Sequence, residues 1–86
     1  MISLKTPCEV VSLFRDGRVY PFRFRYYSIE SVDYRIVDVE KVNFVRENDR
    51  NGLVERTYNV TGRVKRQRNK YDLYQDPRTK SWYILK

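Results

Sequence analysis

The ten residues from Arg18 to Tyr27, RVYPFRFRYY, constrain the fold of this chain more than any other stretch. Large apolar and charged side chains alternate along it, and a period of two is typical of a β-strand with one buried face. No helix gathers three aromatic rings on one side at this spacing. The stretch therefore predicts a strand with an aromatic inner face and a basic outer face. The inner side chains are Phe22, Phe24 and Tyr26, and the outer ones are Arg23, Arg25 and Tyr27.

Turn signals divide the rest of the chain into further strands. Asp16-Gly17 and Asn51-Gly52 suit the positive φ angles of tight hairpin turns, and Asp76-Pro77 suits the start of a turn. Pro21 lacks a donor, so we expect the regular ladder to begin at Phe22 or Pro21 to face solvent at an edge. The expected elements are an irregular lead-in over 1–7, strands over 9–15, 22–27, 34–46, 53–64, 71–75 and 81–86, a polar turn over 47–52 and a basic loop over 65–70.

Two local irregularities are also expected within these strands. The alternation slips in the 34–46 segment, and such slips predict bends or bulges, here near Ile36-Val37 and Glu40-Lys41. Gly62 lies on the apolar face of the 53–64 strand, where it indicates a bulge or the close approach of another backbone.

The length and periodicity predict one small all-β domain over residues 1–86. No segment of ten or more residues has a sustained 3.6-residue apolar pattern, so no substantial helix is expected. Five or six antiparallel strands joined by tight turns predict a small barrel or a strongly curved sheet. An SH3-like or related barrel is the first expectation. An open meander that pairs along an edge into a homodimer is the second.

Composition excludes several functional classes. The chain has no histidine and a single cysteine, Cys8, so a disulfide framework and a Cys/His zinc site are excluded. The three glycines are isolated, which argues against a phosphate-binding loop. The commonest general base is missing, and we expect a non-enzymatic protein without a cofactor. No apolar run is long enough for a signal peptide or a membrane span, so a cytoplasmic protein is expected.

The basic cluster between Arg56 and Lys70 is the strongest candidate for a binding site. It contains six cations and no acidic residue, and the net charge of the chain is +7. Such a charge favours nucleic acid or an acidic protein surface as the partner. The alternative is a solvated hairpin end that protects a sheet edge. The candidate nucleic-acid-binding residues are Arg63, Lys65, Arg66, Arg68, Lys70 and Tyr71, with Arg23 and Arg25 on the outer face of the 22–27 strand.

Each of the two other surface features also has two interpretations. Arg23 and Arg25 could contact a nucleic-acid strand, with Arg35 extending their patch, or they could form cross-strand ion pairs with Glu9, Asp33 or Glu40. In the last strand Trp82 and Ile84 are expected in the core. The last strand is then either fully buried or covered by a partner, in which case Tyr83 and Leu85 could form an exposed apolar strip for a protein.

Several short motifs resemble those of a family of short, uncharacterised bacterial β-domains, some of which occur as the tail module of Y-family polymerase-like proteins. The matching residues are Asp16-Gly17, Pro21-Phe22-Arg23-Phe24, Tyr34-Arg35-Ile36, Tyr58-Asn59-Val60, Tyr71-Asp72-Leu73-Tyr74, Asp76, Thr79 and Trp82. The segment YYSIESVDY lacks the glycine that the family places between its second and third strands. The resemblance implies an all-β fold and a loose association with DNA metabolism.

Overall fold

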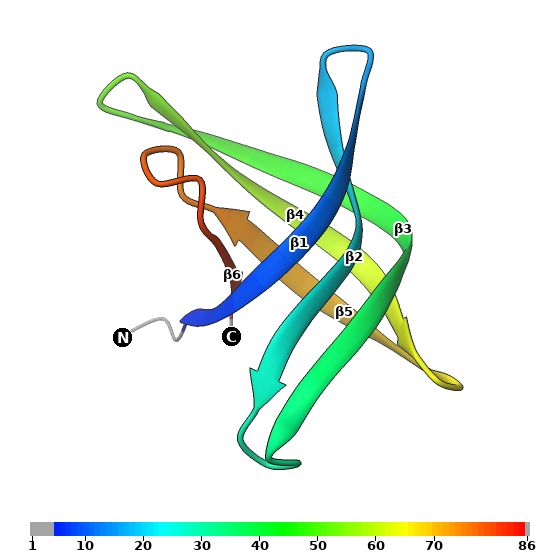
Figure 1. The fold of residues 1–86 in the computed structure, drawn as a ribbon. Coiled ribbons are helices and arrows are strands. Elements are labelled where there is room, and N and C mark those ends of the chain that lie inside the picture. Colours follow the sequence, from blue (N-terminus) through cyan, green and yellow to red (C-terminus); the bar gives the residue numbers. More distant parts are fainter. Residues whose placement is uncertain (1–4, 86) are drawn as a thin grey trace.

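The computed structural model describes residues 5–85, which form a closed barrel of six antiparallel strands (Figure 1). Each strand pairs with the next in sequence, and β1 pairs with β6 to close the barrel. The expectation of a small all-β barrel is confirmed, and no helix occurs among the described residues. The expected open meander is wrong, because Lys5 to Cys8 pair with Leu85 to Trp82. The strands are β1 Lys5–Arg15, β2 Arg18–Ser28, β3 Asp33–Arg50, β4 Leu53–Val64, β5 Gln67–Gln75 and β6 Trp82–Leu85.

The core is small and is built from all six strands. Five of them supply the fully buried apolar side chains, each no more than 5% exposed, and β1 adds the half-buried Cys8 and Val10. Burial in this apolar setting raises the pKa of the Cys8 thiol to about 12, as expected of a buried hydrophobe rather than a nucleophile. The buried set is Phe24, Val37, Tyr58, Val60, Leu73 and Ile84.

β2 contains a bulge that the alternation did not reveal. Val11 pairs with Arg23 and Ser12 with Pro21, so Phe22 is an extra residue without an opposite partner. Phe24 is 1% exposed and Tyr26 packs against the core, as predicted, whereas Phe22 is 38% exposed. The prediction that Phe22 faces inward is therefore wrong, since the bulge shifts the phase at this point. Pro21 is buried within β2, so neither expectation for it, a ladder start at Phe22 or a solvent-facing edge position, is met.

Other strand limits also differ from the expectations. Residues 5–7 belong to β1 and are not an irregular lead-in, and residues 1–4 lie outside the described part. Pro7 pairs with Tyr83 of β6, while pairing with β2 begins only at Cys8. A proline has no backbone N–H to donate, so it is tolerated where its nitrogen can point to the side of the strand that has no partner. Residues 47–50 extend β3, so the expected polar turn shortens to Asn51-Gly52, both at positive φ.

β3 has the two register shifts expected of a strand that bends around a barrel. One lies between Val39 and Lys41, which confirms the bend predicted near Glu40-Lys41. The other lies between Val42 and Phe44, whereas the bend expected at Ile36-Val37 falls in regular pairing with β2. The extra residue of the second shift, Asn43, donates through Nδ2 to Asn59 Oδ1 and Thr61 Oγ1, each at 3.0 Å. These bonds replace the ladder contacts that the shift interrupts.

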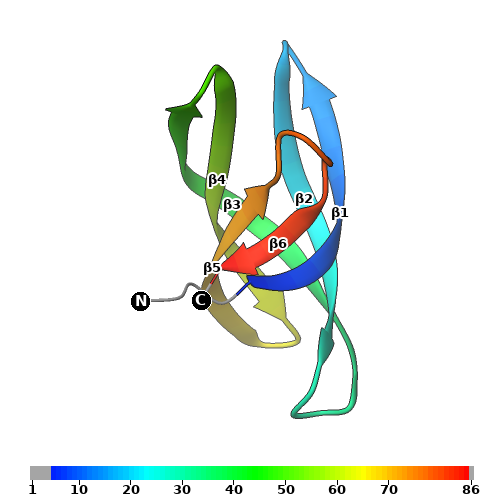
Figure 2. The same cartoon turned by 90° about the vertical axis from the view of Figure 1, so that its left-hand side faces the viewer.

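Two hairpins extend beyond the barrel as arms (Figure 2). The first arm, residues 12–22, consists of the parts of β1 and β2 that pair only with each other, around the turn at Asp16-Gly17. The second arm, residues 48–55, is the corresponding part of β3 and β4. Both arms project from the same end of the barrel. A cleft of about 610 Å³ lies between the first arm and the facing parts of β3 and β4, and its lining mixes apolar and charged side chains, among them Phe14, Tyr20, Val45, Glu47 and Arg56.

Candidate nucleic-acid interface

The strand register places the predicted arginines in one row across the outer face of the barrel. Arg23 of β2 pairs with Asp38 of β3, Asp38 pairs with Arg63 of β4, and Arg63 pairs with Arg68 of β5. The two arginine groups separated in sequence therefore share one continuous surface. We call these four residues the charged row.

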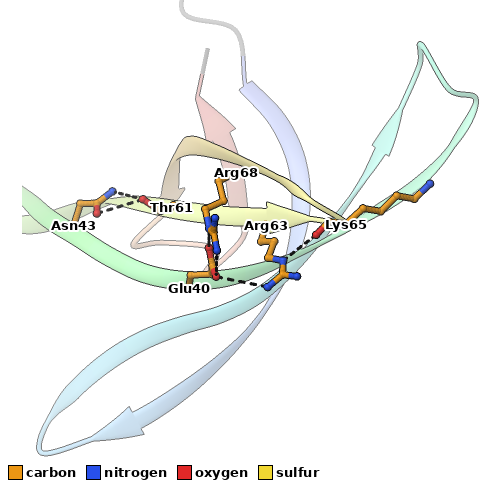
Figure 3. Close-up of polar contacts among 6 residues, drawn as sticks. All are labelled: Glu40, Asn43, Thr61, Arg63, Lys65 and Arg68. Atoms are coloured by element: carbon orange, nitrogen blue, oxygen red, sulfur yellow. Dashed lines mark hydrogen bonds and ion pairs between the residues drawn. The ribbon is translucent and has the colours of Figure 1, made fainter.

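Carboxylates neutralise most of the charged row. Arg23 Nε lies 2.7 Å from Asp38 Oδ1. Glu40, the extra residue of the first β3 shift, accepts hydrogen bonds from Arg68 and lies 4.0 Å from Arg63 (Figure 3). Its hydrogen bond from Arg68 lowers the pKa of the Glu40 carboxyl, so the carboxylate stays ionised throughout the neutral range. The row presents alternating charge rather than a purely cationic surface.

Arg25, beside this row, is also paired. Its Nε and Nη2 both donate to Glu9 Oε1 across the β1–β2 ladder. This is the cross-strand pairing that the sequence offered as an alternative for Arg25. The Arg25 guanidinium also lies 4.7 Å from the centroid of the Tyr34 ring, and Tyr27 meets the same ring edge-on at 5.4 Å. These contacts fix the orientation of Tyr34, whose surface is 56% exposed.

The predicted basic loop over residues 65–70 is wrong as a loop. Lys65, at φ 57°, and Arg66 form a two-residue turn, and β5 begins at Gln67. β5 pairs with β4 from Gln67 onward. This part of the β4–β5 hairpin can form without a core beneath it, because its polar side chains are stable when exposed to solvent. Lys70 therefore lies within β5 opposite Thr61, and Arg68 lies opposite Arg63.

Tyr71 packs inward and is not part of the exposed surface around the turn. Its ring meets Phe24 edge-to-face with centroids 5.1 Å apart, and it contacts the core. Burial raises the pKa of its hydroxyl, with a further contribution from Tyr26 nearby. The expected role of Tyr71 as a stacking partner is therefore not supported by its position.

A further basic surface lies between the β4–β5 turn and the start of β3. It is a hollow of about 890 Å³, which we call the basic hollow. Three of its residues are cations, Arg35, Lys65 and Arg66, and no carboxylate within residues 5–85 lies within 4.0 Å of their charged groups. Its full lining is Ser31, Asp33, Tyr34, Arg35, Ile36, Val64, Lys65, Arg66 and Gln67.

The basic hollow contains both predicted and unpredicted residues. Lys65 and Arg66 were among the candidates, and Arg35 was expected only to extend the Arg23 and Arg25 patch. Tyr34 and Ile36 were missed, although both are more than half exposed. The signal for them was present, because they share a face of β3 that is opposite to Val37 and Val39.

Within residues 5–85 no group of three or more potential metal-ligating side chains comes together. Of the carboxylate pairs in the sequence, Asp38 and Glu40 hold arginines, as does Glu47, while Asp49 accepts from the Gly52 amide at 3.0 Å.

Comparison with known proteins adds no relative. No protein-family model, curated protein or solved structure matches the chain. In the described part no helix has the length and apolar character needed to cross a membrane. The class of protein is thus defined by the fold, a closed six-stranded antiparallel barrel.

Proposed function

We propose that this protein binds single-stranded nucleic acid in the basic hollow. The observation that carries the proposal is the presence of three cations without ion pairs beside an exposed, oriented tyrosine in one concavity. Cations that are not engaged by carboxylates remain available to phosphates, whereas those of the charged row are largely occupied. The proposal therefore moves the site from Arg23, Arg25 and Arg68 to Arg35, Lys65 and Arg66.

The chemistry of the hollow favours a single strand over a duplex. Phosphates are contacted by Lys and Arg, and unpaired bases stack on aromatic or apolar surfaces such as Tyr34 and Ile36. A duplex offers phosphates but hides the faces of its bases. Because Arg25 and Tyr27 already hold the Tyr34 ring, binding costs less ordering of that side chain.

Two sequence observations support the same ligand class. The net charge of +7 favours a polyanion. The resemblance to the tail module of Y-family polymerase-like proteins also implies an association with DNA. We also propose that the barrel is related to SH3-like barrels and that the protein is located in the cytoplasm.

The test compares two triple variants with equal net charge. Arg35→Ala, Lys65→Ala and Arg66→Ala empty the hollow of cations, and Lys41→Ala, Arg78→Ala and Lys80→Ala remove three exposed cations elsewhere. We expect the first triple to lower the slope of log affinity against log salt by roughly 2, at about 0.7 for each phosphate contact. The second should change it by less than half as much. Oligonucleotide binding by fluorescence anisotropy from about 25 to about 200 mM salt measures both.

A Tyr34→Ala variant tests the stacking contribution separately. Base stacking on an aromatic ring contributes about 1–3 kcal/mol, so affinity for an unpaired oligonucleotide should fall roughly fivefold or more. Phe44→Ala, a similarly exposed ring outside the hollow, is the control. Equal loss in the two triple variants, or no effect of Tyr34→Ala, would contradict binding in the hollow.

The second candidate is a protein-interaction module. The Tyr83 and Leu85 strip expected from the sequence is largely buried, and the Lys5 ammonium lies 5.8 Å from the centroid of Tyr83. A larger apolar surface lies on the first arm, where Leu13 is 58% and Phe14 is 76% exposed. Leu13→Ser with Phe14→Ser should leave oligonucleotide affinity unchanged if this surface serves a different partner.

A further inference from the structure

The outer edge of β1 is unpaired over more than half of its length. β6 reaches only from Lys5 to Cys8, and among the described elements β1 contacts only β2 and β6. From Glu9 to Arg15 the backbone is therefore paired on the β2 side alone. Figure 2 shows this part of β1 at the outside of the first arm, away from the β3–β4 hairpin. Closure of the barrel therefore leaves this edge of β1 open.

This edge lacks the usual protection against pairing with another chain. Exposed edges are commonly blocked by lysines, prolines or bulges in the edge strand. Between Glu9 and Arg15 there is no lysine or proline, and the bulge opposite Ser12 lies in β2 rather than β1. Half of the exposed side chains are apolar: Val11 is 52%, Leu13 is 58% and Phe14 is 76% exposed.

The sequence of the edge, EVVSLFR, is complementary to itself in one antiparallel register. When Ser12 faces Ser12 of a second copy, Val11 faces Leu13 and Val10 faces Phe14. At the two ends Glu9 faces Arg15, so opposite charges meet twice. Residues directly opposite in an antiparallel pair point to the same side, so each of these pairs is in contact.

We propose that two copies of this chain associate by antiparallel pairing of their β1 edges, with a two-fold axis at Ser12. Such an interface uses the same patch on both copies, as two-fold dimers require. Neighbouring symmetric registers are worse. Centring on Val11 places Glu9 against Leu13, and centring on Leu13 places Val11 against Arg15. Only the Ser12 register pairs both charges and all the apolar side chains.

The geometry of Glu9 is compatible with this register. Both hydrogen bonds from Arg25 end on Glu9 Oε1. Oε2 has no hydrogen-bond partner within residues 5–85, and the Arg15 side chain of a second copy is a suitable donor. Seven paired residues on each copy form an interface near or below the size of stable complexes, about 1,200 Å². The dimer is therefore reversible and concentration-dependent.

Two charge-reversal variants test the register. Arg15→Glu alone brings two carboxylates together at each end of the paired edges, and Glu9→Lys alone brings two cations together there. Each variant by itself should dimerise at least about tenfold more weakly than the wild type. In an equimolar mixture, the mixed pair brings opposite charges together at both ends of the paired edges.

In the mixed pair, the Arg15→Glu copy keeps the native Glu9 and the Glu9→Lys copy keeps the native Arg15, so one end retains the wild-type ion pair. At the other end the introduced glutamate faces the introduced lysine, which is the same ion pair reversed. The mixture should therefore recover association. Sedimentation velocity from about 10 μM to about 1 mM, the range expected for so small an interface, measures all three samples. Unchanged association of the single variants, no recovery in the mixture, or a wild-type monomer at every concentration would overturn the proposal.

A cysteine placed on the two-fold axis tests the same contact covalently. In a Cys8→Ala background, Ser12→Cys brings two thiols opposite each other within reach of a disulfide. Mild oxidation should cross-link Ser12→Cys to a covalent dimer at least about tenfold faster than Ser31→Cys, which places an exposed thiol in the β2–β3 turn. Equal rates for the two variants would overturn the proposal.

Discussion

At the scale of single residues, Gly62 shows how little free space the core has. It is buried in β4, and a Cβ atom there would collide with Val37 Cγ1 and lie 2.9 Å from Tyr71 Cε2. Neither neighbour can retreat easily, because Val37 is fully buried and Tyr71 packs on Phe24. The sequence predicted a bulge or the close approach of another backbone at Gly62, whereas the atoms that approach it belong to the side chains of Val37 and Tyr71.

Gly62→Ala should therefore destabilise the protein by about 1–3 kcal/mol through overpacking. Val37→Ala removes the methyl groups that the new side chain would meet, so the double variant should cost less than the sum of the two single variants. Urea unfolding followed by circular dichroism gives the three free energies. Additive losses would contradict a direct clash between positions 37 and 62.

Phe22 shows which residues could not be assigned from the sequence. Phe22 alternates with Phe24 and Tyr26 as an inward-facing residue would. It is nevertheless the extra residue of the β2 bulge, and its side chain faces outward. A bulge depends on which residue lies opposite, and that partner comes from another strand. Phe24, Val37 and Ile84 were predictable as core because their neighbours along the strand are polar or lie on the opposite face.

At the scale of elements, the bulges of β3 place specific side chains on the outer surface. Glu40 is the extra residue of the first shift, and it holds Arg63 of β4 and Arg68 of β5. The strand that bends to close the barrel thus also reduces the positive charge next to the basic hollow. Glu40 limits how many arginines are available to an anion.

Glu40→Gln should free Arg63 and Arg68 and strengthen oligonucleotide binding. One additional phosphate contact would raise the salt slope by about 0.7–0.9 and the affinity at low salt by several fold. Glu47→Gln, which frees Arg56 on the other side of the barrel wall, gives the same change in net charge. A similar gain in both variants would indicate a general charge effect and no role for Arg63 and Arg68.

The turns could be predicted where they contain residues that favour positive φ angles. Asp16-Gly17 and Asn51-Gly52 adopt positive φ, as their sequences indicate. The Lys65-Arg66 turn contains no glycine or asparagine, so the flanking polar strands were interpreted as a loop. Strands in the arms and at the start of β5 have no core to face, and their side chains carry no apolar period to detect.

At the scale of the whole molecule, the structure combines a closed barrel with two hairpin arms whose side chains are mostly exposed. The barrel class could be predicted from strand number and turn spacing. Its closure could not, because the pairing of β1 with β6 joins segments from opposite ends of the described chain. The arms lie outside this closure, and their backbone hydrogen bonds are more exposed to solvent.

Amide hydrogen exchange should therefore divide the molecule into two parts. Amides of Val37, Leu73 and Ile84 should exchange most slowly, and those of residues 12–22 and 48–55 should exchange at least about a hundredfold faster. At high protein concentration the amides of residues 9–15 should gain protection if the β1 edge pairs. Mass spectrometry at two concentrations makes the measurement, and uniform protection along the chain would contradict the division.

The pairing of Lys5 with Leu85 has a consequence for protein engineering. The two ends of the described barrel are neighbours on adjacent strands, separated by about 5 Å. A surface loop of a host protein could receive the whole barrel as an insert, because entry and exit lie at nearly the same point. The host would keep its own fold, and the β1 edge and the basic hollow would both project from the insertion site.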